Sequence, residues 1–531
     1  MTRFTSARPP RAGLLVVVAA ATAALLLVTP AVGAPPRAAC EARNNNQYDK
    51  LLECMTLEGV REHQAALQAI ADENGGTRAA ATPGYDASVD YVVDTMEAAG
   101  WNVTTHEFDF TVSEPITQTE PVSATYATGN VTGTAVGTVT GSVVPVDINL
   151  ANPAASTSGC QGAFTEAAVG APLTADPGGP DDFAGFPSGA IALIQRGSCS
   201  FALKVANAQT AGAKAVIIFN QGTAGRTELL TTATAVPPPD SAFTTITIPL
   251  VGASFATGQT LSQPGTVATV SVVNKPQRNV IAELPGRKND NVVMAGAHLD
   301  SVPAGPGIND NGSGSAVLLE LAQQLGNFKP DNTLRFAWWG GEEEGLLGST
   351  AYVEDLSQAE RDRIALYLNF DMVGSPNYIF MVYDADESTF QAPVEIPTGS
   401  TAIEDVFESF YTIVEEPYDD TEFSGRSDYQ AFIENHIPSG GLFTGAEEPK
   451  TEEQAAIWGG TAGEQLDPCY HLACDTFANN NDHALDVNAD AVAYSVLTFA
   501  YSTEQVNGVR GRKVPGRFPT VAPAGPRGTF R

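Results

Sequence analysis

The sequence is poor in basic residues. It has 28 lysines and arginines against 61 aspartates and glutamates, which gives a formal net charge of -33 over 531 residues. Proteins that bind nucleic acid need clustered positive charge, so this balance argues against a nucleic-acid partner. It suits a soluble protein that works outside the cell. The chain is also too long for one ordinary core, and we expect two or more domains.

Long apolar runs are scarce as well, and residues 14–28 form the one that stands out. Arginines precede this run, and small residues that suit cleavage follow it, among them Ala31 and Gly33. The pattern is that of a secretory signal. A membrane anchor is the competing interpretation, but the run is short for a bilayer span. No adjacent arginine pair occurs here, which favours the general secretory route. We therefore expect residues 1–33 to be removed and the mature protein to be secreted, without a membrane anchor.

Cysteine is rare, with six residues in the chain, and none of them forms a CxxC pair. The missing spacing speaks against a cytosolic zinc module and against thiol redox catalysis. An even number of cysteines fits an oxidising compartment. Many pairings are possible, and proximity in the sequence suggests Cys40 with Cys54, Cys160 with Cys199, and Cys469 with Cys474.

The composition changes along the chain. Residues 40–120 show helical patterns followed by a strand pattern at 101–110, and residues 121–272 are rich in Thr, Val, Ala, Gly and Pro with short strand-like runs. From 273 to 503, strands alternate with helices, which predicts an α/β three-layer sandwich with a largely parallel, mixed central sheet. The strands are expected at 292–297, 334–339, 364–370 and 441–443. The tail at 504–531 is basic and rich in Gly and Pro, and we expect it to be disordered.

One segment of the central region has a distinctive order. Residues 188–201 read as a strand and a turn, and residues 204–219 as a helix, a glycine break and a buried strand. This segment resembles the protease-associated (PA) domain, a small β-rich module found in or beside several peptidase families. The resemblance assigns residues 121–272 to such a domain, for which we hypothesise a lid or substrate-access role. An unrelated insert with no role beyond folding is the alternative.

Ionisable side chains follow the ends of the predicted strands. They are His298 and Asp300 after the first strand, Asp310 ten residues later, Glu342, Glu343 and Glu344 after the second strand, Asp371 after the third, and His471 in a late loop. Because ligands bind beyond the carboxyl ends of strands in open α/β sheets, we expect these side chains to converge.

Each of these elements alone is a weak signal. A His-x-Asp is more often a surface arrangement, a run of glutamates usually starts an exposed helix, and an aspartate after a strand is commonly a helix cap. Together they are informative, because gathered carboxylates repel one another unless cations neutralise them. Imidazoles and carboxylates are the ligands of hydrolytic zinc sites, which leave a position open for water. Two divalent ions would use five ligands and leave one carboxylate as a base.

The segments that carry these residues resemble a known family. They are residues 297–302, 307–314, 336–349, 369–377 and 469–471. These segments are similar to the secreted co-catalytic di-zinc aminopeptidases of the bacterial leucyl aminopeptidase and aminopeptidase Y type. The resemblance implies that 40–120 and 273–503 form one peptidase domain with two zinc ions. It also implies that peptide or protein N-termini are the substrate.

The resemblance gives the ligands their roles. His298 and Asp371 would bind one zinc, Glu343 and His471 would bind the other, and Asp310 would bridge both. The family also has a cis peptide after the bridging aspartate, so the bond between residues 310 and 311 is a candidate for that conformation.

Two further carboxylates have implied roles. Glu342 would be the general base, and Asp300 would orient His298 by accepting its second ring N–H. Three consecutive glutamates leave the register open to a slip. Alignment on residues 345–349 places the base at Glu342 and the ligand at Glu343.

The resemblance also implies substrate contacts. Tyr470 would hydrogen-bond the oxyanion, Arg426 would contact the substrate, and Phe443 would line an apolar pocket that favours leucine and similar residues. Without the resemblance, Tyr470 reads equally well as a packed tyrosine and Arg426 as a surface ion pair of little energetic value. Asp371 and Glu342 could hold the cationic α-amine.

Three other functions stay open at this point. A carboxypeptidase or amide hydrolase on the same scaffold would need a basic residue for the terminal carboxylate, and Arg426 keeps it possible. A non-catalytic binding protein would have lost ligands, and none is missing here. A single-zinc cyclotransferase relative would not need the full ligand set. We expect a monomer.

Overall fold

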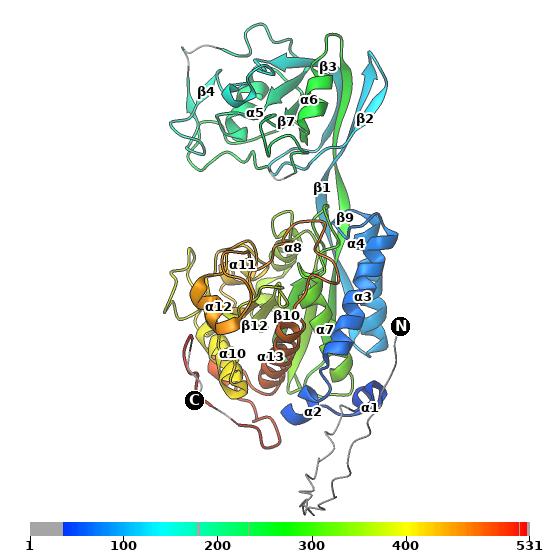
Figure 1. The fold of residues 1–531 in the computed structure, drawn as a ribbon, viewed down its shortest axis with the longest axis vertical. Helices are drawn as coiled ribbons and strands as arrows, with labels where there is room; N and C mark the ends of the chain where they lie inside the picture. Colours follow the sequence, from blue (N-terminus) through cyan, green and yellow to red (C-terminus); the bar gives the residue numbers. More distant parts are fainter. Residues whose placement is uncertain (1–34, 177, 179–180, 232, 520, 528–531) are drawn as a thin grey trace, which may run out of the picture.

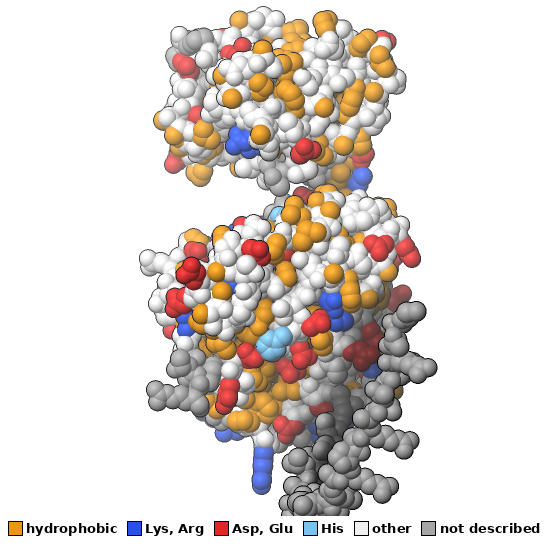
Figure 2. Space-filling view, in the orientation of Figure 1, with side chains coloured by type: hydrophobic (Ala, Val, Ile, Leu, Met, Phe, Trp, Pro, Cys, Tyr) orange, Lys and Arg blue, Asp and Glu red, His pale blue; other side chains and the backbone are white. Residues whose placement is uncertain are grey.

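The computed structural model describes residues 35–176, 178, 181–231, 233–519 and 521–527. It shows two lobes joined by a narrow neck of paired strands (Figures 1 and 2). The signal predicted at residues 1–33 lies outside the described residues. Within the described ranges, no helix has the length and apolar character needed to cross a bilayer.

The larger lobe contains a mixed sheet in the strand order β14-β13-β15-β12-β10-β11-β9-β1. Strand β10 is parallel to both β11 and β12, and β12 is parallel to β15, whereas β9 is antiparallel to β11 and to β1. The strands are β1 (Asn102–Glu120), β9 (Val267–Leu284), β10 (Lys288–His298), β11 (Asn332–Trp339), β12 (Ile364–Phe370), β13 (Met381–Tyr383), β14 (Asp419–Thr421) and β15 (Ser439–Phe443).

Alternate side chains of the central strands enter two separate cores. Val293 and Ala295 of β10 belong to a core shared with one set of helices, whereas Met294 belongs to a core on the opposite face. Successive strand residues point to opposite faces, so burial on both faces gives the continuous apolar runs of the sequence. The first core includes α3 (Leu57–Glu73), α4 (Pro83–Ala98), α7 (Gly312–Leu325), α10 (Ser400–Val414) and α13 (Asp482–Tyr501), and the second includes α8 (Leu347–Asp355) and α11 (Tyr429–Glu434). The predicted three-layer α/β sandwich is confirmed.

Shorter helices complete the larger lobe. They are α1 (Arg37–Ala42), α2 (Tyr48–Leu52), α9 (Gln358–Arg361), α12 (Glu452–Trp458) and α14 (Glu504–Asn507). The disulfides Cys40–Cys54 and Cys469–Cys474 lie in this lobe, and Cys160–Cys199 lies in the smaller one. The three pairings predicted from sequence proximity are therefore confirmed, and no cysteine is free.

The smaller lobe is a β-rich insert with its own apolar cores. Its neighbouring parallel strands are β3 (Gly137–Val146), β6 (Ile191–Gln195), β7 (Ala215–Phe219) and β8 (Leu250–Ala253), accompanied by α5 (Phe201–Thr210) and α6 (Phe255–Leu261). Short β2 (Ala124–Tyr126), β4 (Phe164–Thr165) and β5 (Thr174–Ala175) complete it. The strand, helix and strand predicted between residues 188 and 219 appear as β6, α5 and β7.

The neck consists of β1 and β9, and both strands are longer than the sequence pattern suggested. The strand predicted to end at residue 110 continues to Glu120 and pairs antiparallel with β9 along most of its length. Strand β9 also pairs with β3, so the predicted boundary at 272 falls inside a strand that serves both lobes. Because β9 enters the larger lobe from the insert and β11 is antiparallel to it, the carboxyl ends of β10, β11 and β12 point towards the insert.

The sequence favours disorder in the tail at residues 504–531, of which residues 520 and 528–531 lie outside the described ranges. The described part of the tail packs against the larger lobe. Arg512 binds Asp331, with Nε and Oδ2 at 2.6 Å, and Arg527 binds Asp419, with NH2 and Oδ2 at 2.7 Å. Acidic side chains are scattered over the visible face of this lobe (Figure 2). The tail is held because its few cations find carboxylates on a strongly acidic surface, a contact that composition alone does not show.

Candidate metal centre and active site

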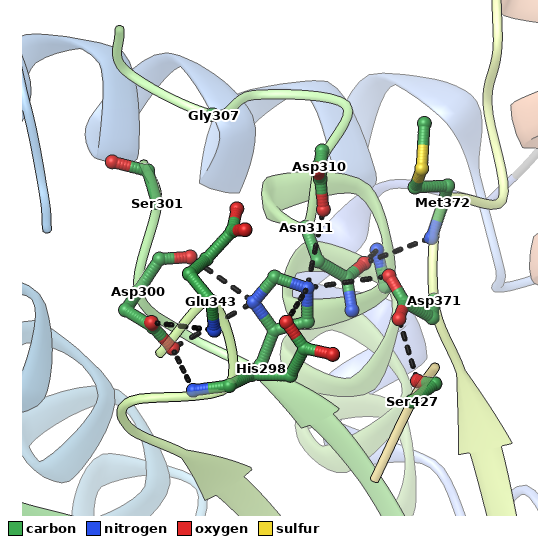
Figure 3. Close-up of polar contacts among 12 residues, drawn as sticks. His298, Asp300, Ser301, Gly307, Asp310, Asn311, Glu343, Asp371, Met372 and Ser427 are labelled. Atoms are coloured by element: carbon green, nitrogen blue, oxygen red, sulfur yellow. Dashed lines mark hydrogen bonds and ion pairs between the residues drawn. The ribbon is translucent and has the colours of Figure 1, made fainter. Parts of the chain in front are cut away.

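The predicted ligand residues meet at the carboxyl ends of the central strands (Figure 3). His298 is the last residue of β10, and Asp371 follows directly after β12. Glu343 stands in the turn after β11. Asp310 lies two residues before α7, in the loop that connects β10 to this helix. The strand order and the late loop that carries His471 bring together residues that are up to 173 positions apart.

Two groups of potential ligand atoms share Asp310. In the first group, His298 Nε2 lies 3.2 Å from Asp310 Oδ1 and 3.3 Å from Asp371 Oδ1. In the second group, His471 Nε2 lies 3.4 Å from Asp310 Oδ2 and 3.0 Å from Glu343 Oε2. Each oxygen of Asp310 thus faces a different histidine.

The electrostatics of this cluster favour added positive charge. Burial opposes a charged His298, yet the carboxylates of Asp371 and Glu342 raise the pKa of its ring well above the ordinary value. Burial also opposes a charged His471, but Asp310 and Glu343 raise its pKa to about 10. Burial and the charge of Asp310 raise the pKa of Glu343 to about 8. Protons or cations would relieve the repulsion among these carboxylates.

The donor set fits divalent zinc. Glu343 Oε1 and Asp371 Oδ1 are buried, and neither has a hydrogen-bond partner within the described chain. Buried polar atoms are nearly always satisfied, so such orphan oxygens point to a missing ligand. Two imidazoles and three carboxylates are the ligand types that zinc takes in hydrolytic sites.

The Asp300 carboxylate lies nearer to two main-chain N–H groups than to the ring of His298, which it was predicted to orient. His298 Nδ1 donates to the main-chain oxygen of Asp300 at 3.1 Å, whereas the Asp300 carboxylate lies 3.7 Å away. That carboxylate instead accepts the main-chain N–H groups of Glu342 and Glu343, at 3.2 and 3.3 Å (Figure 3). The two adjacent N–H donors therefore lie closer to the Asp300 carboxylate than the ring of His298 does. Asp300 therefore fixes the turn that presents both glutamates.

Asn311 fixes the position of Asp371 from both sides. Its Nδ2 donates to the main-chain oxygen of Phe370 at 2.8 Å, and its Oδ1 accepts the N–H of Met372 at 3.2 Å. Asp371 Oδ2 also accepts the hydroxyl of Ser427 at 2.5 Å. No local pattern in the sequence marks Asn311 or Ser427 as part of the site, because both act through contacts distant in the chain.

Asp475 supports the residue that both groups share. Its carboxylate accepts the main-chain N–H groups of Asn309 and Asp310, at 2.8 and 3.0 Å. The peptide bond between Asp310 and Asn311 is cis, as the resemblance implied. Asp475 follows the disulfide of the His471 loop by one residue, so a single loop carries one ligand and anchors another.

We expect Asp475→Asn to weaken zinc binding by about 10–100-fold, the usual effect of removing the outer partner of a ligand. The amide can accept only one of the two N–H groups, so the Asp310 loop loses part of its support. Zinc titration of the metal-depleted variant measures the effect. The exposed Asp482→Asn serves as the matched control. Unchanged zinc affinity in Asp475→Asn would show that Asp475 does not position the site.

Arg78 supports the loop between His298 and Asp310. Its guanidinium is fully buried and donates to the main-chain oxygens of Leu299, Pro306 and Gly307. Burial lowers the pKa of this group to about 10. Arg78 precedes α4, far from the loop in sequence, and no local pattern marks it.

His471 lies in a constrained loop. Its φ of 57° is in the left-handed region, which residues other than glycine seldom adopt and which recurs at functional sites. The Cys469–Cys474 disulfide closes the loop around it. The Tyr470 ring stacks on the imidazole with 3.8 Å between the centroids.

A cavity of about 480 Å³ opens beside the ligand groups. Glu342 lines it, whereas Glu344, the other candidate from the glutamate run, does not. Tyr470, Arg426 and Phe443 line it too, so the three predicted substrate residues share one cavity with the ligands. Arg426 donates to Glu447 Oε1 at 2.8 Å and to the Tyr470 hydroxyl at 3.1 Å.

Asp428 is a further buried carboxylate that the sequence analysis passed over. It is 1% exposed, and neither of its oxygens has a hydrogen-bond partner among the described residues. Burial, with the charges of Asp371 and Asp300, raises its pKa to about 7. Asp428 follows Arg426 by two residues, and the family resemblance gave a role to Arg426 but not to Asp428.

Comparison with known proteins agrees with this geometry. Residues 279–496 match the model of peptidase family M28, and residues 139–261 match that of the PA domain. An aminopeptidase from Pseudomonas aeruginosa is 43% identical over 468 residues, which cover 86% of this chain and 83% of the relative. The chain belongs to peptidase family M28.

Two further proteins extend the comparison. A probable leucine aminopeptidase 2 from Aspergillus fumigatus is 46% identical over 327 residues, covering 60% of this chain and 64% of that protein. The solved zinc aminopeptidase BSAP from Bacillus subtilis shares the fold, with a TM-score of 0.57 and 24% identity over 83% of this chain and 94% of that one. This M28 member is a metallo-aminopeptidase with an inserted PA domain.

Proposed function

We propose that this M28 enzyme is a secreted, two-zinc aminopeptidase that prefers bulky apolar N-terminal residues such as leucine. The observation that carries the proposal is the shared position of Asp310, whose two oxygens face the two histidines. His298 and Asp371 would complete one zinc site with Asp310, and Glu343 and His471 would complete the other.

Bound zinc would supply Lewis acidity for the scissile carbonyl and for an attacking water. The protein supplies the base. Glu342 lines the cavity, belongs to neither ligand group, and is held through its main-chain N–H by Asp300. It is therefore placed to take the proton of the water and to return it to the leaving amine.

The remaining cavity residues suit a peptide N-terminus. Glu342 and Asp371 provide negative charge for a cationic α-amine, and Tyr470 offers a hydroxyl to the oxyanion, its orientation set by Arg426. Phe443, with Leu346 and Met372, supplies an apolar wall for the side chain of the first residue.

The competing functions fit less well. In a carboxypeptidase, Arg426 would bind the terminal carboxylate of the substrate, but here it is engaged by Glu447 and Tyr470. A non-catalytic relative would lack ligands, and a single-zinc cyclotransferase would not need two groups that share Asp310.

We expect the enzyme to hydrolyse leucyl anilide and to leave N-blocked leucyl anilide intact, because the blocked compound has no cationic amine to bind. A chelator should abolish the activity, and added zinc should restore it. Release of the aniline chromophore measures both compounds in parallel. Equal cleavage of the blocked compound would reject the exopeptidase assignment, and chelator-resistant cleavage would reject the metal.

Secretion and the role of the insert are parts of the same proposal. The paired cysteines suit an oxidising compartment outside the cytoplasm. The active-site edge of the sheet points towards the PA domain, which supports a role for that domain in substrate access. We propose a monomer as the working form.

A further inference from the structure

A second group of carboxylates, all buried except Asp386, lies between the ends of β13 and β14 and helix α10. Asp384, Asp386 and Glu404 form one set of neighbouring oxygens, and Glu404, Glu408 and Asp420 form another. Within each set the potential ligand atoms lie within 4.8 Å of one another. We call these five residues the β13–β14 cluster. Both glutamates project from α10, four residues apart, and therefore lie on one face of this helix.

The cluster has no cation of its own in the described chain. None of the ion pairs among the described residues includes one of its members, and the nearby Arg527 binds Asp419 instead. Burial, then the charges of Asp386, Glu408 and Asp384, raise the pKa of Glu404 to about 9. Burial and the charge of Asp420 raise the pKa of Glu408 to about 7. The carboxylates repel one another, and solvent screens this repulsion only in part.

Two buried polar atoms at this place lack partners within the described chain. Asp420 is 4% exposed, and its Oδ1 accepts no hydrogen bond, although its Oδ2 accepts the hydroxyl of Thr389. Tyr418 is fully buried, and its hydroxyl lies beside Glu408 without a hydrogen bond of good geometry. Glu408 is the charge that acts most strongly on this phenol, which places the hydroxyl beside the cluster. Such orphan atoms are rare in folded proteins and indicate a missing ligand.

Main-chain groups hold the outer carboxylates in fixed positions. Asp384 accepts the N–H groups of Ser388 and Thr389, both at 2.9 Å. Glu404 accepts those of Ala385 and Asp386 through one oxygen, at 3.1 and 3.0 Å. The loop after β13 therefore wraps around the carboxylates, and the second oxygen of Glu404 has no main-chain donor.

We propose that the β13–β14 cluster binds one Ca²⁺ ion. All its donors are oxygens, which hard cations prefer, and no nitrogen or sulfur is present to select zinc. Crowded carboxylates from three separate segments suit the flexible coordination of Ca²⁺ better than the strict octahedron of Mg²⁺. This site is separate from the proposed zinc centre and does not depend on it.

The position of the cluster links it to the catalytic cavity. Tyr383 and Thr421 pair across β13 and β14, and both line that cavity. Asp384 directly follows the first of these residues, and Asp420 directly precedes the second. A bound ion would therefore hold one wall of the cavity in place. Its main effect is expected on thermal stability, with a smaller effect on KM.

The test uses the zinc-loaded enzyme in calcium-free buffer, titrated with CaCl₂ at constant zinc. Elemental analysis counts bound calcium before and after the titration, and thermal unfolding gives Tm. We expect one Ca²⁺ per chain and a saturable rise in Tm of roughly 5 °C. The double variant Glu404→Gln with Glu408→Gln should take up no calcium. Without calcium it should melt no lower than the wild type, because burial already raises the pKa of both glutamates and neutral amides take their place without a charge to bury.

Matched controls separate this site from general salt effects. Glu354→Gln removes one exposed charge on α8 and should respond to calcium like the wild type. MgCl₂ should give a clearly smaller Tm rise; an equal rise would overturn the assignment to calcium. Absence of calcium from the wild type at millimolar CaCl₂, or equal uptake by the double variant, would overturn the site. Asp420→Asn serves the same purpose if the double variant does not fold.

Discussion

The Glu342→Gln variant is expected to keep its zinc and to lose roughly 10³-fold in kcat. Glutamine has nearly the same shape as glutamate, so the main-chain bond from residue 342 to Asp300 remains and the turn keeps its position. The amide cannot accept the proton of the attacking water. Ground-state binding should change little, so KM is expected to stay within a few-fold of the wild-type value.

The neighbouring glutamates provide the control for this experiment. Glu344 belongs to the same run of three but does not line the cavity, so Glu344→Gln should retain near-normal kcat. The pair of variants therefore tests the register that the sequence left open. A near-normal rate in Glu342→Gln, with a large loss in Glu344→Gln, would shift the register by one, to a base at Glu343 and a ligand at Glu344, and contradict the proposed site.

The Asp310→Asn variant should bind neither zinc ion well, since one carboxylate serves both ligand groups. Its amide offers a single neutral oxygen and a nitrogen that cannot bind a cation. We expect zinc affinity and kcat/KM each to fall by about 10²-fold or more. This loss exceeds the one expected when a residue that only supports a ligand, such as Asp475, is replaced. Elemental analysis of the folded variant and zinc titration measure the first effect, and hydrolysis of leucyl anilide measures the second.

Glu343→Gln is the comparison that isolates the bridging role. Glu343 belongs only to the group with His471, so this variant should retain one tightly bound zinc per chain. Circular dichroism must show that both variants remain folded. Two firmly bound zinc ions in Asp310→Asn would rule out a bridging carboxylate and, with it, the paired-ion proposal.

Much of the site was predictable because its motifs stand at strand ends. The residues of β10, β11 and β12 are buried on both faces, which makes each strand a continuous apolar run with a clear carboxyl end. His298 ends the first run, Glu343 stands in the turn after the second and Asp371 directly follows the third, so their convergence was predictable from the parallel sheet. The disulfide pairing was predictable for a similar reason, because each cysteine pairs with the cysteine nearest to it in its part of the sequence.

Residues that act through a folded neighbour could not be found in this way. Asp475 and Arg78 bind main-chain groups of a loop that lies far from them in sequence, and neither has a local pattern. The contacts of Asp300 could not be derived from the sequence, because the ring of His298 and two main-chain N–H groups compete for one carboxylate. Only their relative positions in space decide that competition.

The sequence by itself determined the α/β sandwich, the cysteine pairs and the set of candidate ligands, because strand periodicity and motif spacing are local properties. Its resemblance to a known module implied the inserted PA domain. The tertiary structure decided which oxygen faces which histidine, how far β1 and β9 extend, and that the basic tail packs on an acidic lobe. It also brought the β13–β14 carboxylates together from three separate segments. These features depend on distances between remote segments, and such distances exist only once the chain has folded.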